Sequence, residues 1–469
     1  MYKKRVTYFA LGALLSAASC TKEAAEPEVY EWEKGEIYFR TSLADVSATR
    51  AMDMTLDNLE SFQVTCFNTG DIKKDAGGII LPYFADATFI RDNKSSLVTY
   101  KSSPAEGPRD WPEKDGLLKF YAFSPSCNVM MAGNAAITEQ HRADYFNLIN
   151  NSKESGSTVS IDYKLGTLRV NPDISGQFDF VTASASGERW KDFAGGVALD
   201  FKHQMSRVEL KAWGANPSYN FEIAGIRLGN PVVEGAFNLA SGASGSWETS
   251  TNTVKGKVEY IFRAEDKGDK IFCINATTHS TPETAGSLMG TAGAAMVIPT
   301  FNTKWEGLAD QNIDVKPYST EKMYFSVLLR VTGSNNGNKI YPYPGNPDNM
   351  TVIYYAVANS GEIISRLYPG DTPDTFYRDE QRQQPYTAAE DEEIKDFGWA
   401  AIPIDVDWEA GKSYVYTLNY SEGIGIHDPQ DPDPGRPIGV QNPITWGVAV
   451  SKWDYAVKNE DYDPDLDVP

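Results

Sequence analysis

The stretch VALDFKHQMSRVELKAW, residues 197–213, decides the fold. Every second residue from Val197 to Phe201 is apolar, and the same alternation resumes from Val208 to Ala212 after a short break. A period of two is typical of strands that bury one face and leave the other in water. The stretch is therefore predicted to form two half-buried strands, over 197–203 and 206–213, with the residues between the apolar ones, such as Glu209, facing water.

Composition extends this pattern to the whole chain. Aromatic residues make up 12% of the 469 residues, and 38 Gly and 26 Pro lie between short strand-like runs, which is typical of an all-β protein. One helix is expected over 138–149, and the stretches 335–349 and 368–391 are expected to be surface loops. The further predicted strands are 61–68, 88–91, 97–100, 117–123, 178–182, 221–228, 235–239, 270–275, 294–299, 322–331, 351–357 and 413–420.

The N-terminus has the features of an export signal. Lys3, Lys4 and Arg5 precede an apolar run over 6–18, and the small residues before Cys20 suit a signal peptidase. The run is too short for a spanning helix, which takes about 20 apolar residues. A cysteine at this place is typical of a lipoprotein signal, so Cys20 is the predicted lipidation site, which would hold the chain on a membrane without spanning it. An ordinary secretory signal is the alternative.

A short alternating strand follows the signal at residues 36–40. Ile37 and Phe39 face one way and Tyr38 the other, so this strand can add to a sandwich and place two or three apolar side chains in its groove. Burial of that size is worth on the order of 3 to 6 kcal/mol before ordering costs. We therefore expect a strand that fills a groove and can still leave once its connection is cut.

A lone arginine between small residues ends this segment. Arg50 closes the stretch LADVSATR, residues 43–50, which has no strong helix or strand pattern and is expected to be an exposed linker. Cleavage between Arg50 and Ala51 would separate the strand from the rest of the chain, whereas an ordinary loop arginine is the alternative. An anchor, a strand and a cut site in series indicate a segment that is held for a time and then removed.

Chain length and turn-rich breaks suggest the domain organisation. The 469 residues have room for two or three domains of ordinary size. The break WGANPS, which begins at Trp213, follows a complete set of strands and is the best boundary. The predicted parts are a signal peptide over 1–19, a removable segment over 20–50, an N-terminal β-sandwich over 51–213, a C-terminal β-sandwich over 214–437, and a strand with an acidic tail over 438–469.

The last of these parts contains a strand with a regular alternation of size. Ile444, Trp446, Val448 and Val450 fall on one face, and small residues fall on the other. A Pro-rich run over 428–437 precedes it and favours extended backbone, so the strand can be held away from its own domain. Burial of the four large side chains would contribute roughly 6 to 12 kcal/mol, which is about twice the burial energy of the N-terminal strand. The strand is predicted to be a donor that replaces the N-terminal one; the alternative is the final strand of its own domain.

Charge and cysteine content exclude several classes of partner. With 43 Lys and Arg against 64 Asp and Glu the net charge is −21, so nucleic acid and anionic lipid are poor partners. After Cys20 only Cys66, Cys127 and Cys273 remain, an odd number without metal-ligand spacing. Cys66 shares a face with Phe62 and is expected in the core.

No sequence pattern points to catalysis or to a cofactor. The four histidines lie in unlike contexts, at His141, His203, His279 and His427. His203 ends a strand pattern and is expected to be a hydrogen-bonded structural residue, and no GxSxG, HExxH, P-loop or dinucleotide fingerprint occurs. The acidic runs 428–433 and 461–467 are expected to be solvated loops; a calcium site is the less favoured alternative, since the run 428–433 lacks the Gly and terminal Glu of an EF-hand loop. We expect no enzymatic activity, no metal site and no cofactor.

Several runs together resemble the fimbrillin family, the lipoprotein pilins of type V pili. They are the lipoprotein signal, ATRA over 48–51, WP at 111–112 with LLKFYAF over 117–123, VALDFKHQMSRVEL over 197–210, and WEAGKSYVYTL over 408–418. The resemblance covers nearly the whole chain, and it implies two transthyretin-like β-sandwich domains with Greek-key-type connections.

The same resemblance implies a function. It implies a surface pilus subunit that supports adhesion, reaches the outer membrane as a lipoprotein, loses its N-terminal strand to an arginine-specific protease, and polymerises with other pilin subunits by strand exchange. The long connections of the second domain and the acidic end after Trp453 depart from the family pattern. A stalk, a tip and an accessory subunit therefore all remain open.

A second class of function stays open beside the polymer subunit. A monomeric surface lipoprotein could bind a glycan or a host protein through exposed aromatic side chains, for which Trp190, Trp247 and Trp305 are the candidates. Aromatic residues in sandwich strands are more often core than binding platform. The state of the mature N-terminus separates the two functions, because a lipid-blocked Cys20 supports the binder and a free Ala51 supports the pilin.

Overall fold

The computed structural model describes residues 35–43, 54, 59–92, 99–113, 116–124, 148–150, 153–155, 158–161, 163–240, 245–248, 259–263, 269–303, 322–342, 352–428 and 444–452. These residues form strands in several sheets, with one single-turn helix, α2 (Arg189–Asp192), and a few 3-10 turns. The prediction of a mostly β chain is therefore confirmed. No helix in these ranges has the length and apolar character needed to cross a bilayer.

Among the described residues, the N-terminal strands close into a seven-stranded barrel. Its members follow the order β1-β11-β10-β5-β2-β3-β4 around the ring. Their bounds are β1 (Tyr38–Leu43), β2 (Ser61–Asn68), β3 (Phe84–Asp92), β4 (Thr99–Ser102), β5 (Leu117–Ser124), β10 (Val181–Glu188) and β11 (Val197–His203). The ring closes because β1 hydrogen-bonds to a strand on each side, parallel to β11 and antiparallel to β4.

Alternation of side chains explains the barrel core. Along β11 burial alternates strictly with exposure, so Val197, Leu199 and Phe201 point inward. Cys66 on β2 is fully buried with Phe62, as expected from their shared face. Burial raises the pKa of the Cys66 thiol well above its usual value, so this cysteine stays protonated and acts as a small apolar side chain.

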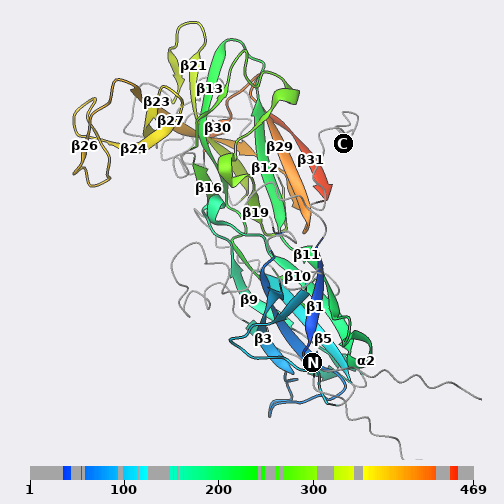
Figure 1. Cartoon of the computed structure of the whole chain (residues 1–469). Coiled ribbons are helices and arrows are strands. Elements are labelled where there is room, and N and C mark those ends of the chain that lie inside the picture. The colour runs from blue at the N-terminus through cyan, green and yellow to red at the C-terminus, as the bar shows by residue number, and fades with distance from the viewer. Residues whose placement is uncertain are drawn as a thin grey trace, which may run out of the picture.

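Two larger sheets face each other at the other end of the elongated molecule (Figure 1). The larger runs β16 (Glu259–Arg263), β13 (Tyr219–Gly229), β21 (Tyr324–Gly333), β27 (Glu392–Pro403), β23 (Ile353–Ala358), β24 (Ile363–Pro369), β25 (Phe376–Tyr377) and β26 (Pro385–Tyr386), with β17 (Phe272–Ile274), β22 (Lys339–Tyr341) and β30 (Ile426–His427) beside this path. The smaller runs β18 (Gly286–Ser287), β12 (Ser206–Trp213), β29 (Lys412–Asn419) and β31 (Thr445–Lys452), with β19 (Ala295–Val297) on β12. Side chains such as Phe325 and Tyr416 meet between the two sheets, with ring centroids 4.9 Å apart.

Three small sheets complete the described structure. They are β15 (Ser246–Glu248), β14 (Glu234–Asn238), β9 (Tyr163–Arg169) and β6 (Leu148–Asn150); β20 (Thr300–Asn302) with β28 (Val406–Trp408); and β7 (Lys153–Ser155) with β8 (Thr158–Ser160). One buried apolar cluster runs from Phe67 of the barrel through Tyr163 of β9 to Tyr416 of β29. The two ends of the molecule therefore share a continuous core.

Several sequence predictions differ from these elements. The helix expected over 138–149 is wrong at its end, where β6 begins at Leu148, and the rest of that range lies outside the described residues. Glu209 is buried instead of facing water, because β12 has strand partners on both sides and Arg207 lies 3.8 Å from its carboxylate. The expected loop 368–391 contains the short strands β25 and β26.

The passage from the barrel to the large sheets takes two residues. β11 ends in the barrel at His203, and β12 begins at Ser206 as a partner of β29, with the two strands parallel. The break predicted after Trp213 thus lies one strand beyond the point where the chain changes sheet. Alternation alone could not indicate this change, because both strands have the same period-two pattern.

Candidate functional site

Strand β1 pairs with a described strand along each of its two edges. Phe39 lies opposite Val197 of β11 on one side and opposite Tyr100 of β4 on the other. Without β1 the described barrel strands keep the order β11-β10-β5-β2-β3-β4, an open sheet with a gap between its two ends. The predicted removable strand is therefore the closing strand of the barrel.

Ile37, just before β1, and the first side chains of β1 point as the sequence predicted. Ile37 and Phe39 are fully buried, and Tyr38 is half-buried and donates a hydrogen bond to the Ala194 carbonyl. The Phe39 ring meets three other rings edge-on, with centroid distances of 4.7 Å to Phe89, 5.2 Å to Phe120 and 5.9 Å to Phe62. Such contacts add about 0.5–1.5 kcal/mol each to simple burial. Phe39 is thus the main anchor of the strand.

The segment that leads into β1 is hydrogen-bonded to residues 109–111. The Ile37 amide donates to the Arg109 carbonyl at 2.7 Å, and the Trp111 amide donates to the Gly35 carbonyl at 2.9 Å. Phe193, in the turn after α2, covers Gly35 so closely that an added Cβ would lie 2.0 Å from its Cε2 atom. A side chain at this position would require the exposed Phe193 ring to move aside.

The predicted cut and lipid sites flank this strand in sequence. Cys20, Arg50 and Ala51 lie outside the described residues. The nearest described residue after the cut site is Met54, whose amide donates to Asp179 Oδ2 at 3.1 Å. The chain is therefore tied to the barrel three residues beyond Ala51.

Asp179 also explains the histidine of the FKH run. His203 Nδ1 lies 2.7 Å from Asp179 Oδ2, and both side chains are buried. The expected structural role of His203 is confirmed, since the pair links the end of β11 to the segment that precedes β10. The contact gives each of these buried side chains a polar partner, which a lone buried histidine or carboxylate would lack.

The predicted donor strand is β31, the edge strand of the sheet β18-β12-β29-β31. β31 pairs antiparallel with β29 over its whole length, with Val448 opposite Tyr416 (Figure 1). Ile444 is buried, Trp446 and Val448 are half-buried, and Val450 is 52% exposed. In this position the apolar face of the strand is covered only in part.

A buried ion pair fixes the chain just before the linker to β31. Arg227 donates from Nε to Asp428 Oδ2 at 3.1 Å and from Nη2 to Oδ1 at 2.5 Å, and its guanidinium lies 4.3 Å from the Trp399 ring centroid. Asp428 is fully buried, so the expectation of a solvated loop over 428–433 is wrong at its first residue. The rest of that run, and 461–467, lie outside the described residues.

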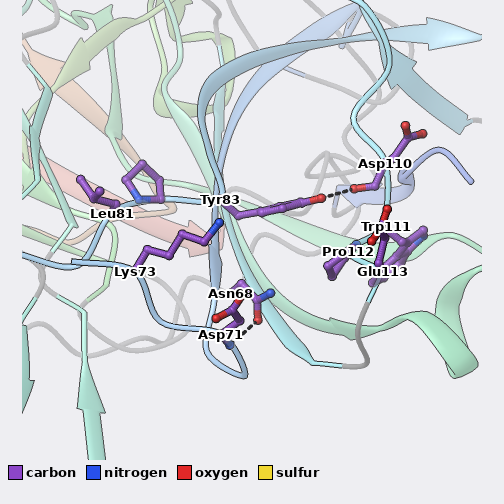
Figure 2. A pocket seen from close by; sticks show the side chains of 10 residues that line it. Asn68, Asp71, Lys73, Leu81, Tyr83, Asp110, Trp111, Pro112 and Glu113 are labelled. Atoms are coloured by element: carbon purple, nitrogen blue, oxygen red, sulfur yellow. Dashed lines mark hydrogen bonds between the residues drawn. The ribbon is translucent and has the colours of Figure 1, made fainter. Parts of the chain in front are cut away.

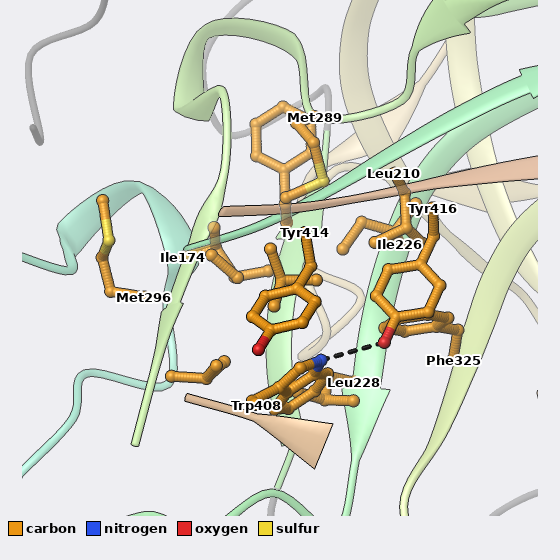
Figure 3. Close-up of a cluster of buried hydrophobic side chains, with 14 of the residues drawn as sticks. Ile174, Leu210, Ile226, Leu228, Met289, Met296, Phe325, Trp408, Tyr414 and Tyr416 are labelled. Carbon is orange, nitrogen blue, oxygen red and sulfur yellow. Dashed lines mark hydrogen bonds between the residues drawn. The ribbon is translucent and has the colours of Figure 1, made fainter. Parts of the chain in front are cut away.

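The WEAGKSYVYTL run, residues 408–418, contributes the side chains of Trp408, Tyr414 and Tyr416 to the large buried cluster (Figure 3). Trp408 Nε1 donates to the Tyr416 hydroxyl at 2.9 Å, and the Tyr414 hydroxyl donates to the Asp407 carbonyl at 2.8 Å. Gly411 has φ +70°, which the tight turn between Trp408 and β29 requires. The motif is thus a strand-turn-strand unit in which each buried polar atom of its aromatic residues has a partner.

A cleft of about 410 Å³ opens beside the entry of β1 (Figure 2). Its lining residues come from the turn between β2 and β3 and from the segment before β5: Asn68, Asp71, Lys73, Leu81, Pro82, Tyr83, Asp110, Trp111, Pro112 and Glu113. The Tyr83 hydroxyl donates to the Asp110 carbonyl at 3.0 Å across the cleft. Burial raises the pKa of Tyr83, with smaller effects from nearby Cys66, Asp110 and Glu113, so the hydroxyl stays a donor at neutral pH.

The family described as "Fimbrillin-like" matches residues 49–350. The chain belongs to the fimbrillin-like family. This confirms the resemblance drawn from the sequence runs, and the matched range begins one residue before Arg50. No curated protein matches the chain.

Solved structures similar to this fimbrillin-like chain are distant in sequence. A candidate cell adhesion protein from Bacteroides uniformis is 10% identical, covers 89% of this chain and 98% of its own, and has a TM-score of 0.36. One from Parabacteroides distasonis is 12% identical, with coverages of 89% and 99% and a TM-score of 0.35. One from Bacteroides ovatus is 14% identical, with coverages of 90% and 99% and a TM-score of 0.33.

Sequence reasoning found the two strands of this fimbrillin-like chain but missed the cleft. Nothing in the separate runs 68–83 and 110–113 indicates that they meet, because barrel closure brings them together. Of the candidate aromatic platforms, Trp190 is 67% exposed, Trp247 is half-buried with Nε1 donating to the Gln204 carbonyl, and Trp305 lies outside the described residues. Within the described ranges no three His, Cys, Asp or Glu residues are grouped as metal ligands.

Proposed function

We propose that this fimbrillin-like chain is a surface subunit of a pilus that supports adhesion. The precursor is held on the outer membrane by lipid on Cys20, an arginine-specific protease cuts between Arg50 and Ala51, β1 leaves, and β31 of another pilin subunit fills the vacated groove. The proposal includes the two transthyretin-like sandwich domains with Greek-key-type connections that the family resemblance implies.

One observation carries the proposal: among the described strands β1 closes the barrel, and it lies in the segment before the proposed cut site. Removal of Ile37 and Phe39 would expose an apolar groove lined by Phe62, Phe89 and Phe120. It would also leave unpaired the facing edges of β4 and β11. An open, apolar sheet edge is a template for an added strand, which supports strand exchange as the next step.

The partial burial of β31 supports its role as the incoming strand. On its own sheet it has one strand partner and leaves Val450 half exposed. In a groove between β4 and β11 it would have a partner on each side and would bury the whole face from Ile444 to Val450. Because it gains burial and hydrogen bonds by moving, exchange is favoured in this direction.

Arg50→Ala tests the proposed activation. Removal of the only basic residue between Arg40 and Lys73 takes away the site for an arginine-specific protease in this stretch. The variant is expected to fold as the parent does and to stay monomeric after protease treatment. Circular dichroism checks the fold, and light scattering with electron microscopy measures polymer.

Arg40→Ala is the matched control for that experiment. Arg40 is exposed on β1, so its loss leaves the proposed cut intact, and polymer should form as in the parent. Normal polymer from Arg50→Ala would rule out activation at this arginine. A mass spectrum of the parent that lacked a fragment ending at Arg50 would contradict it independently.

A further inference from the structure

We propose that the cleft beside the entry of β1 binds a neutral saccharide. Its volume of about 410 Å³ lies in the range of small-molecule sites, and its lining combines one aromatic face with several polar side chains. Tyr83 forms the aromatic wall and is 42% exposed, although it stands in a hollow. Its hydroxyl is tied to the Asp110 carbonyl, so the ring is held in a fixed orientation.

The polar lining has hydrogen-bonding capacity that the protein does not use. Asn68 Oδ1 accepts from the amides of Gly70 and Asp71, each at 3.0 Å, while its amide nitrogen donates to no described residue. Lys73 makes no ion pair with any carboxylate in the described ranges. Trp111 is buried, and its indole Nε1 has no hydrogen-bond partner there. Asn68 and Lys73 both line the cleft, so these donors are available to a ligand bound there.

The charge of the lining decides between classes of ligand. Asp71, Asp110 and Glu113 place three carboxylates around the cleft against the single ammonium of Lys73. An anionic sugar or a phosphate would be repelled by this excess and by the net charge of −21. Carboxylates accept hydrogen bonds from pairs of hydroxyls, and an aromatic face packs against the apolar face of a sugar ring. These features favour a neutral hexose over an acidic one.

One wall of the cleft is built on the segment that precedes β1. Asp110 lies between Arg109 and Trp111, and these two residues exchange backbone hydrogen bonds with Ile37 and Gly35. If β1 leaves, the wall keeps the bond from Tyr83 and the bond from Arg189 Nη1 to the Pro112 carbonyl, at 3.3 Å. The cleft is therefore complete in the uncleaved chain and loses support after cleavage. This coupling rests on the proposed function, whereas the binding itself does not.

The binding test uses the uncleaved Arg50→Ala chain. D-galactose, D-glucose and N-acetyl-D-glucosamine serve as neutral probes and D-glucuronate as the anionic one, in saturation-transfer NMR titrations. At least one neutral probe should bind saturably with a Kd on the order of millimolar, and Tyr83→Ala should weaken it about tenfold. Asp71→Ala, at an exposed position, should weaken it as well and serves if Tyr83→Ala does not fold. Phe301→Ala removes a 70% exposed aromatic ring far from the cleft and should change nothing.

Three results would overturn the site. They are no saturable binding of any neutral probe, equal binding of glucuronate, and unchanged affinity in both cleft variants. The coupling is tested separately on the parent chain after cleavage, with loss of residues 20–50 followed by mass spectrometry. Binding about tenfold weaker after strand loss is expected; equal binding would refute the coupling. If the strand stays bound after cleavage, the proposed function fails while saccharide binding to the uncleaved chain still stands.

Discussion

The variant Phe39→Ala is expected to lower the free energy of unfolding of the uncleaved chain by about 3 to 5 kcal/mol. Phe39 is fully buried at the centre of the barrel, and three rings contact it edge-on. These rings come from β2, β3 and β5, which cannot collapse onto the vacancy without breaking their own pairing. Urea denaturation followed by circular dichroism measures the loss in the Arg50→Ala background, where β1 stays attached.

The same variant separates an integral strand from a removable one. In the parent chain, after cleavage at Arg50 and loss of the released segment, residue 39 is no longer part of the protein. The Phe39→Ala and parent proteins should then have equal stability, and the variant should lose its strand faster. Phe301→Ala is the matched control, because truncating this exposed ring should change stability by no more than about 0.5 kcal/mol. A 3 to 5 kcal/mol difference that persisted after cleavage would mean that β1 remains in the barrel.

Strands with strict alternation and clear flanking breaks were predictable from sequence. Ser61–Asn68, Val197–His203 and Ser206–Trp213 are observed with the bounds that were predicted. In each case one face is apolar over at least three positions, and the break contains residues that satisfy buried backbone, such as Gln204, whose amide donates to the Phe180 carbonyl. Local chemistry is enough to define such elements.

The longest described strand, β27, was missed for a physical reason. Its first half, EEIKD, has four charged residues in five, and its second half, FGWAAIP, is apolar without alternation. The charges are tolerated because Glu222 of β13 and Arg330 of β21 pair with them: Lys395 lies 2.5 Å from Glu222, and Arg330 lies 3.7 Å from Asp396. Consecutive residues of the apolar half are buried, so both faces of this half are covered, while β21 pairs with one edge and β23 or β30 with the other. Neither condition can be read from one segment alone.

The candidate site likewise has one part that local sequence predicts and one part that depends on distant strand pairing. The orientation of Ile37, Tyr38 and Phe39 follows from a period of two and is observed. The closure of the barrel by β1 depends on a parallel pairing with β11, about 158 residues away, which no local pattern encodes. The cleft depends on the same closure, because the segment at Arg109–Trp111 is placed by its bonds to Gly35 and Ile37.

Truncation after Pro437 is expected to abolish polymer formation while the chain still folds. The truncated chain keeps the Arg227–Asp428 pair, so the second core is closed before the linker begins. It loses an edge strand with one buried and two half-buried large side chains, which is worth on the order of 3–5 kcal/mol. Urea denaturation should give a cooperative transition at lower urea, and light scattering after activation should give monomer. A truncated chain that fails to fold would instead assign β31 to its own core.

A single substitution in the same strand separates these two roles more sharply. Val450→Asp places a carboxylate where the side chain is 52% exposed in the monomer, so stability should change by no more than about 0.5 kcal/mol. In the groove of another subunit the same carboxylate would be buried among Phe62, Phe89 and Phe120 without a partner, which costs several kcal/mol and should prevent polymerisation. Thr445→Asp is the control, because Thr445 lies on the opposite face of the strand and stays outside the groove. Normal polymer from Val450→Asp would mean that this face never enters another subunit, whatever the truncated chain does.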